Sequence, residues 1–425
     1  MGPTVKAQLE VASAIYRDGR FTEAEAAYLK VQELDPKNAT VLVGLGTIAL
    51  WNNCLEQAEH YFKEATDYAP GTQKFWPFSI QLKTLLAMTY YRQDRFPEAA
   101  RLFKEAAGPV GLGPFRDIRA LGQHLALFGK EAPYIIEGPE ETRVDFVVTD
   151  PLPVIEVSVN GSTPLLFFID TGGAEIVLDT ALAKEVGAEI SGTMTGESAG
   201  PKGRIGLGKV DSMMIGDWVI NNVPIHTVDT DPFSAVFNGL NVKGVIGTRL
   251  LMHSLGTIDY VNGSLALRRT PPANLQKLGA QVETQRVKVI PFWLVQTHYL
   301  VAWGTVNGKG PMLFLVDTGL AGKGFTAPGS TLQEAGITVD WTKGQEGVGG
   351  FGKVKEVDIV LNQLTLGTHP NEVVEHNVPG VALEKTLAVL GDRLGFQIGG
   401  LISHQFFRNY ALTLDFRGMR LFLQH

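Results

Sequence analysis

The chain has 425 residues, of which 44% are hydrophobic and 19% are charged, a balance typical of a globular protein with room for two or three domains. Its formal net charge of −7 argues against nucleic-acid binding as the main role, because contacts to phosphates need a basic face. The single cysteine, Cys54, excludes internal disulfides and a cysteine-rich metal site.

No run of about eighteen apolar residues occurs, so we expect no membrane-spanning helix. The first residues, Met1 to Lys6, have no hydrophobic segment of the kind that a signal peptide needs. As written, the sequence predicts a cytoplasmic protein. An export segment upstream of the given residues would instead place it in the periplasm or outside the cell.

The first 110 residues carry a repeating pattern of small and aromatic residues. Ala24 and Ala58 occupy matching places 34 positions apart, and Ala99 takes the same place 41 positions after Ala58. About seven residues are therefore inserted near 70–77. A period of 34 is that of the tetratricopeptide repeat (TPR), a helix-turn-helix unit. Residues 1–110 thus resemble three TPR-like repeats, and we expect their concave face to bind a substrate or a protein partner.

Residues 111–142 are expected to close the repeats and to lead into the next region. Residues 116–128 have a helical pattern that ends at Gly129, and they could cap the stack. Residues 131–143 are charged and contain two prolines, which is typical of a linker or of a segment that approaches the next domain. On this reading the repeats form a self-contained unit.

From about residue 143 onward, short apolar runs alternate with glycine-rich turns, which predicts a mainly β region. Asn160-Gly161 and Asn307-Gly308 each lie between two apolar runs, and Asn-Gly in that setting is a strong hairpin signal. We therefore expect two hairpins, one in each half of the region.

The second strand of each expected hairpin ends in the same tripeptide, Asp-Thr-Gly, at 170–172 and at 317–319. Segments further along also recur: Gly244–Leu251 matches Gly400–Phe407 at an offset of 156 positions (400 − 244). The two tripeptides are 147 positions apart (317 − 170), so the second copy holds about nine extra residues. The β region is thus an internal duplication.

Two buried strands that each deliver one aspartate to a turn can hold a carboxylate pair. Two carboxylates a few Å apart cannot both ionise, so one stays protonated and acts as an acid while its neighbour acts as a base. Asp170 and Asp317 are therefore the candidate catalytic residues.

Each half resembles a retropepsin-type aspartic protease unit, and the two halves together resemble the bilobal architecture of pepsin-like proteases. The resemblance covers about 143–425 and implies a first lobe at 143–270, a connector at 271–285 and a second lobe at 286–425. With the repeats, the expected fold class is multidomain α + β: an N-terminal TPR stack followed by a mainly-β bilobal aspartic protease fold with two β-barrel lobes.

The resemblance implies an aspartic endopeptidase, a hydrolase that acts on polypeptides through a water held by Asp170 and Asp317. It implies no metal and no organic cofactor. It also implies four supporting residues in the two active-site turns, where the threonines bridge the lobes and the glycines let main-chain N–H groups reach the carboxylates: Thr171, Gly172, Thr318 and Gly319.

The sequence departs from the family pattern at Ser403, which replaces a glycine that the first half has at Gly247. The glycine-rich segments 196–208 and 344–352 occupy the flap positions, and no tyrosine lies between Gly192 and Asp217. An alternative function is thus a weak or inactive protease fold that acts as a TPR peptide-binding scaffold. A third interpretation, a peptidase assembled from identical chains, has weaker support, because one chain already supplies both aspartates.

Two other catalytic patterns find little support in the sequence. No His-Glu-x-x-His sequence is present, so a zinc protease is not supported. Ser403-His404 could be a fragment of a serine-protease triad, but its place in the duplicated frame predicts a structural role.

Overall fold

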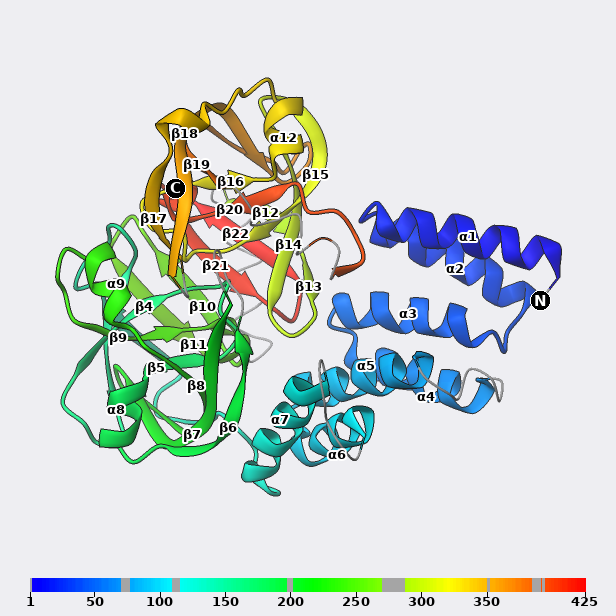
Figure 1. The fold of residues 1–425 in the computed structure, drawn as a ribbon, viewed down its shortest axis with the longest axis horizontal. Helices are drawn as coiled ribbons and strands as arrows, with labels where there is room; N and C mark the ends of the chain where they lie inside the picture. Colours follow the sequence, from blue (N-terminus) through cyan, green and yellow to red (C-terminus); the bar gives the residue numbers. More distant parts are fainter. Residues whose placement is uncertain are drawn as a thin grey trace.

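A computed structural model describes residues 2–69, 77–108, 115–196, 202–269, 287–349, 352–383, 391 and 394–425. An N-terminal stack of helices is followed by a β-rich region of two lobes, which confirms the predicted fold class (Figure 1). The predicted connector at 271–285, most of the predicted insertion near 70–77 and the tips of both predicted flaps lie outside the described residues. Among the described residues, no helix is long and apolar enough to cross a membrane.

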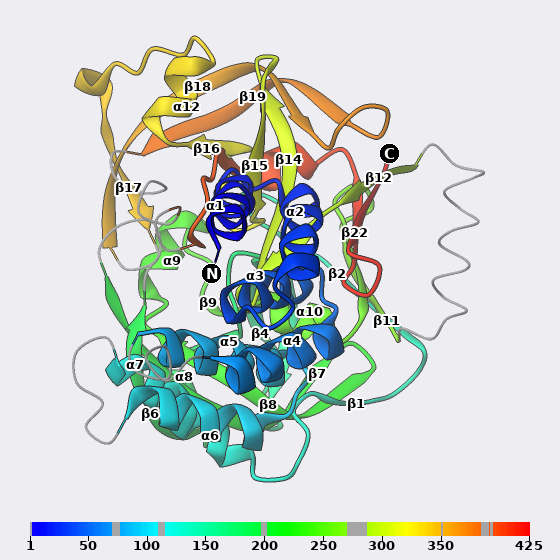
Figure 2. The ribbon, with the colours of Figure 1, turned by 90° about the vertical axis from the view of Figure 1, so that its right-hand side faces the viewer.

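The helical stack consists of three helix pairs and a seventh helix that follows them (Figure 2). Ala58 and Ala99 are fully buried, as the repeat pattern predicts, so neighbouring helices can approach closely. A Cβ at Gly46 would lie 2.6 Å from the Phe62 ring, which shows how tightly the second pair packs. The elements are α1 (Pro3–Arg17), α2 (Phe21–Leu34), α3 (Ala39–Trp51), α4 (Leu55–Tyr68), α5 (Phe78–Arg92), α6 (Phe96–Ala107), α7 (Phe115–Leu125) and the 3₁₀ helix η1 (Ala126–Phe128).

The first lobe is a closed barrel with strand order β1-β8-β5-β9-β4-β3-β7-β6, closed by the pairing of β7 with β8. Its opening hairpin, β3 and β4, turns at Asn160-Gly161 as predicted. Its elements are β1 (Ile135–Glu137), β3 (Val154–Val159), β4 (Leu165–Ile169), β5 (Ile176–Asp179), α8 (Thr180–Glu185), β6 (Glu189–Gly196), β7 (Gly203–Ile215), β8 (Trp218–Val228), α9 (Asp231–Val236), β9 (Val242–Ile246) and α10 (Thr248–Met252).

The second lobe repeats this plan, with strand order β13-β14-β15-β20-β16-β19-β18-β17 and an added pairing of β14 with β18. Its opening hairpin, β14 and β15, turns at Asn307-Gly308. Its elements are β13 (Trp293–Val295), β14 (Tyr299–Val306), β15 (Lys309–Val316), β16 (Phe325–Ala327), α12 (Gly329–Glu334), η2 (Trp341–Lys343), β17 (Gln345–Gly349), β18 (Gly352–Leu366), β19 (Val373–Leu383), β20 (Gly400–Ile402) and α14 (His404–Phe407).

A six-stranded sheet joins the two lobes, in the order β12-β22-β21-β10-β11-β2. At its centre β10 and β21 run antiparallel, and Thr257 lies opposite Thr413 with their hydroxyl oxygens 2.7 Å apart. These two threonines are related by the sequence offset of 156, so matching strands of the two copies meet at the middle of the sheet. The strands are β12 (Val287–Pro291), β22 (Arg420–Gln424), β21 (Ala411–Asp415), β10 (Leu255–Asp259), β11 (Ser264–Arg268) and β2 (Glu141–Asp145).

The segment 131–143, predicted as a linker, instead contributes one strand to the sheet of the first lobe and one to the six-stranded sheet. β1 (Ile135–Glu137) pairs with β8, and β2 pairs with β11 at the edge of the six-stranded sheet. The linker prediction is wrong because the charged residues of this segment lie on the exposed face of a strand: Thr142 is buried between exposed Glu141 and Arg143. Such alternation is that of an edge strand with one buried face.

The helical stack is not self-contained, because it shares a hydrophobic core with the second lobe. The Phe21 ring lies 5.4 Å from the Trp293 ring and 5.0 Å from the Phe396 ring, both in edge-on geometry. At the α1–α2 turn, Gly19 lies against Leu313 of β15, where a Cβ would collide. The stack and the second lobe are therefore packed together as one body.

Candidate active site

Each candidate aspartate follows a buried strand that is held in a parallel pair. β4 leads to Asp170 and pairs with β9, and β15 leads to Asp317 and pairs with β20. Asp170 N donates to Ile246 O at 3.0 Å, and Asp317 N donates to Ile402 O at 3.0 Å. The same backbone bond thus fixes both aspartates at equivalent points of the two lobes.

Thr171 and Thr318 bridge the lobes by reciprocal hydrogen bonds. Thr171 N donates to Thr318 Oγ1 at 3.1 Å, and Thr318 N donates to Thr171 Oγ1 at 3.0 Å. Each hydroxyl then donates to a carbonyl of the opposite lobe, Thr171 to Val316 O at 2.9 Å and Thr318 to Ile169 O at 3.2 Å. Both threonines are fully buried, so this arrangement holds the two turns against each other.

Gly172 and Gly319 bring each main chain against the opposite carboxylate. Gly172 N donates to Asp170 Oδ1 at 2.7 Å, and Gly319 N donates to Asp317 Oδ1 at 2.8 Å. A Cβ at Gly172 would collide with the Asp317 carboxylate, and one at Gly319 would collide with the Asp170 carboxylate. Only glycine fits at these two positions. The carboxylates of Asp170 and Asp317 thus lie together, as expected from the sequence.

Electrostatics at the pair favour a shared proton. Burial, the Asp317 charge and a hydrogen bond with Asp317 raise the pKa of Asp170 well above its usual range. Burial also raises the pKa of Asp317, against the opposing effect of the hydrogen bond from Asp170 and the N–H groups of Gly319 and Gly172. Two carboxyl groups this close titrate as a pair rather than as separate groups.

Ser403 fits its position without strain. Its φ of −138° is extended backbone, so no glycine is required there. Leu320 N donates to Ser403 Oγ at 3.0 Å, so the hydroxyl supports the turn that follows Asp317. In the first lobe a Cβ at Gly247 would collide with the Glu175 carbonyl, which explains why that copy keeps a glycine.

The Ser403-His404 pair is structural, as predicted. His404 Nε2 lies 2.8 Å from Asp150 Oδ1, and burial lowers the pKa of His404. Since Ser403 Oγ is engaged by the backbone of Leu320, serine and histidine do not form a nucleophile and base.

Sequence reasoning missed two residues close to the aspartates. Glu175, five positions after Asp170, is buried, and burial raises its pKa to about 7. His298, which precedes β14, lies against the backbone of Gly172, and burial lowers its pKa to about 3, so it is neutral at neutral pH. Neither has a counterpart in the other copy at its duplicate position, so the repeat pattern carried no signal for them.

One grouping of acidic residues in the described part of the chain has metal-ligand spacing, formed by Asp179, Asp229 and Asp231. Lys243 Nζ lies 3.9 Å from Asp179 Oδ1 and 3.7 Å from Asp231 Oδ1, so a lysine ammonium already offsets the negative charge. Asp179 also caps α8 by accepting from two backbone N–H groups. These contacts explain the grouping without a cation.

One comparison with known proteins, a family match, agrees with this geometry. Residues 155–250 match the family described as "Aspartyl protease", a span that includes Asp170 and lies within the first lobe. No curated protein matches the chain. Among solved structures, the N-terminal domain of stress-induced protein-1 (STI-1) from C. elegans is 16% identical, with 28% of this chain and 94% of that chain covered and a TM-score of 0.25. The family match supports an aspartyl protease fold and a protease-type function in general.

Proposed function

We propose that this chain is an aspartic endopeptidase that hydrolyses peptide bonds with Asp170 and Asp317 as its catalytic pair. The observation that carries the proposal is the contact of each glycine in the two turns with the opposite carboxylate. That contact brings together two carboxyl groups from the two copies, as a shared water requires. The accommodation of Ser403 removes the feature that favoured an inactive scaffold.

The mechanism follows from the shared proton. A water between the two carboxyl groups loses a proton to the ionised aspartate while the protonated aspartate donates to the oxygen of the scissile carbonyl. The water oxygen bonds to the carbonyl carbon and gives a tetrahedral gem-diol. Its collapse breaks the C–N bond and sends a proton to the leaving amine. No covalent enzyme intermediate forms. The threonine bridge and the glycine N–H groups keep the carboxyl groups in place throughout.

The first prediction tests the pair directly. Asp170→Asn and Asp317→Asn should each lower kcat on a peptide mixture by about a thousandfold or more, because the amide keeps the shape but removes the acid–base exchange. The exposed Asp211→Asn on β7 is the matched control and should cleave like wild type. Pepstatin should inhibit the wild type. Near wild-type turnover by either dyad variant would exclude the mechanism.

The helical stack is proposed to recruit a polypeptide substrate or partner. A hollow of about 470 Å³ between α5, α6 and α7 is lined by Lys83, Lys104, Glu105, Gly108, Arg119 and Gln123. Glu105 pairs with Lys83 at 3.3 Å, and the three cations outnumber this one carboxylate, which favours a segment with acidic residues. The second prediction is that Lys104→Glu lowers kcat/KM several-fold for an acidic protein substrate but not for a short peptide. Exposed Lys309→Glu on β15 is the control. An equal effect of both variants would contradict recruitment at this hollow.

A further inference from the structure

The three repeats contact the β region through the same turn. Gly19, Asn53 and Asp94 lie between the helices of successive pairs, at the repeat spacings of 34 and 41, and have φ of 75°, 57° and 59°. Gly19 packs against Leu313 of the second lobe, and Asn53 Nδ2 donates to Phe416 O beside the six-stranded sheet at 2.9 Å. The turn of the third pair reaches the first lobe.

That third contact is ionic and largely buried. Asp94 Oδ1 accepts from Arg249 Nη2 at 2.6 Å, and His253 Nε2 lies 2.8 Å from Asp94 Oδ2. Arg249 belongs to α10, and its side chain is 1% exposed. Its backbone N donates to Ala174 O at 2.9 Å, within the turn that carries Asp170. Asp94, which follows α5, is thus connected to this turn through Arg249.

Tyr91, in the last turn of α5, binds the same turn through Glu175. The Tyr91 hydroxyl donates to Glu175 Oε1, and the Tyr134 hydroxyl donates to Glu175 Oε2. Glu175 is 2% exposed, so its carboxyl group depends on these protein partners. A side chain of the helical stack therefore anchors the segment that begins at Asp170.

Arg92, the next residue, binds the second lobe. Its Nη1 donates to Leu294 O at 3.0 Å and to Gln296 O at 3.4 Å, which fixes the turn between β13 and β14. His298 in this turn lies against the backbone of Gly172. Gly172 in turn contacts both aspartates, since its N–H donates to Asp170 and its α-carbon lies against the Asp317 carboxylate.

We propose that Tyr91 and Arg92 are positioning residues for the aspartate pair, so that the end of α5 holds the Asp170 turn and the β13–β14 turn in register. This inference rests on the proposed peptidase function for its kinetic consequences only. The helical stack is then a third structural part of the active site, in addition to any recruiting role. The two consecutive residues divide the task, with Tyr91 bound to the first lobe and Arg92 to the second.

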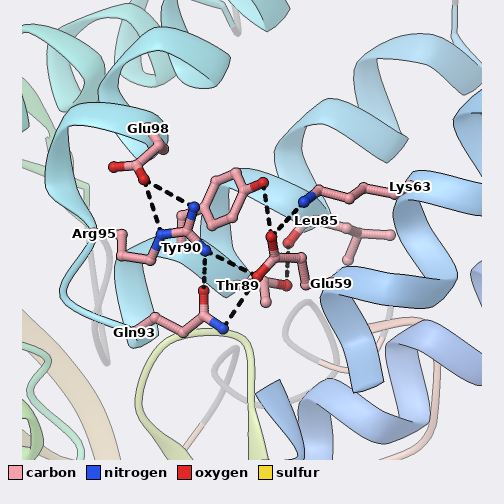
Figure 3. Close-up of polar contacts among 8 residues, drawn as sticks. All are labelled: Glu59, Lys63, Leu85, Thr89, Tyr90, Gln93, Arg95 and Glu98. Carbon is pink, nitrogen blue, oxygen red and sulfur yellow. Dashed lines mark hydrogen bonds and ion pairs between the residues drawn. The ribbon is translucent and has the colours of Figure 1, made fainter. Parts of the chain in front are cut away.

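The chain offers matched controls for both residues in a network that stays inside the stack (Figure 3). Tyr90 is adjacent to Tyr91 on α5, and its hydroxyl donates to Glu59 of α4 at 3.2 Å. Arg95 follows α5, and it binds Glu59 at 2.9 Å and Glu98 at 2.8 Å. Tyr90→Phe and Arg95→Lys thus remove the same chemical groups without touching either lobe.

The kinetic test compares Tyr91→Phe with Tyr90→Phe in the full chain. Tyr91→Phe should lower kcat about tenfold with KM within about twofold of wild type, because a loosened turn misplaces one carboxyl group of the pair. Tyr90→Phe should leave both constants unchanged. A loss of thermal stability with unchanged kcat per folded enzyme would show a merely structural role and overturn the proposal.

The pH profile supplies a second readout. A looser pair weakens the interaction with Asp317 that keeps a proton on Asp170, so the basic limb of kcat/KM should move to lower pH by about half a unit in Tyr91→Phe. An unmoved limb would overturn the proposal. The carboxyl group of Asp170 faces Asp317 and the N–H groups of Gly172 and Gly173. The carboxyl group of Glu175, which Tyr91 binds, faces Tyr91, Tyr134 and Arg249.

A readout without activity separates this inference from the proposed function. Amide hydrogen exchange in residues 170–175 should rise about fivefold or more in Tyr91→Phe, and exchange in 294–299 should rise similarly in Arg92→Lys. The reason in Arg92→Lys is that one ammonium nitrogen replaces two guanidinium nitrogens that together contact four oxygens, those of Leu50, Asn53, Leu294 and Gln296. Both control variants should exchange like wild type. An inactive wild type would refute the peptidase while exchange still decides the positioning role, and unchanged exchange would overturn that role.

Discussion

At the residue scale, the buried Glu175 gives folding a pH dependence that can be measured. Its pKa is about 7 in the folded chain against 4.5 for the free group, so the folded state binds the proton more tightly. The contribution of this proton to the free energy of unfolding is at its maximum below about pH 4.5 and is lost as pH rises through 7. The raised value follows from burial, which the Arg249 charge only partly offsets.

The third prediction uses that difference. Between pH 5 and 8 the wild type should lose about 2.5 kcal/mol of unfolding free energy through Glu175, and Glu175→Gln should lose correspondingly less. Urea unfolding at the two pH values measures this, with exposed Glu156→Gln on β3 as control. An equal pH dependence in Glu175→Gln and wild type would show that Glu175 does not hold a proton in the folded state.

At the element scale, the two Asp-Thr-Gly turns are coupled by the threonine bridge. The fourth prediction is that Thr318→Ala costs about 1–3 kcal/mol of unfolding free energy, since the buried Thr171 N–H loses its acceptor. Thr318→Ser keeps the hydroxyl and should recover most of that loss. Urea unfolding distinguishes the two, and a serine variant as unstable as the alanine variant would point to the lost methyl group instead.

At the scale of the whole molecule, the helices and lobes form one packed body. The fifth prediction is that a fragment lacking residues 1–110 will not unfold cooperatively, because it exposes the second-lobe part of the shared core, including Val301, Leu313 and Leu315. It also removes Tyr91 from the buried Glu175. Circular dichroism with heating measures this. A cooperative transition near the wild-type temperature would establish that the lobes fold alone.

The sequence by itself determined the repeated parts of this protein. The 34-residue period indicated the helix pairs, and two Asn-Gly hairpins with two Asp-Thr-Gly turns indicated two similar lobes. These features are local patterns that recur, so spacing alone exposes them. The pairing of Asp170 with Asp317 followed from that duplication, because equivalent strands of two copies meet about a common axis.

Only the tertiary structure revealed the contacts that have no equivalent in a second copy of a repeat. The contacts of Tyr91 with Glu175, of Arg92 with the β13–β14 turn and of His298 with Gly172 join residues from 84 to more than 200 positions apart, or lie in one copy only. Likewise, 131–143 joined the sheets because a partner strand was available at each edge. Such contacts depend on how packed elements meet in space, and no periodicity along the chain encodes them.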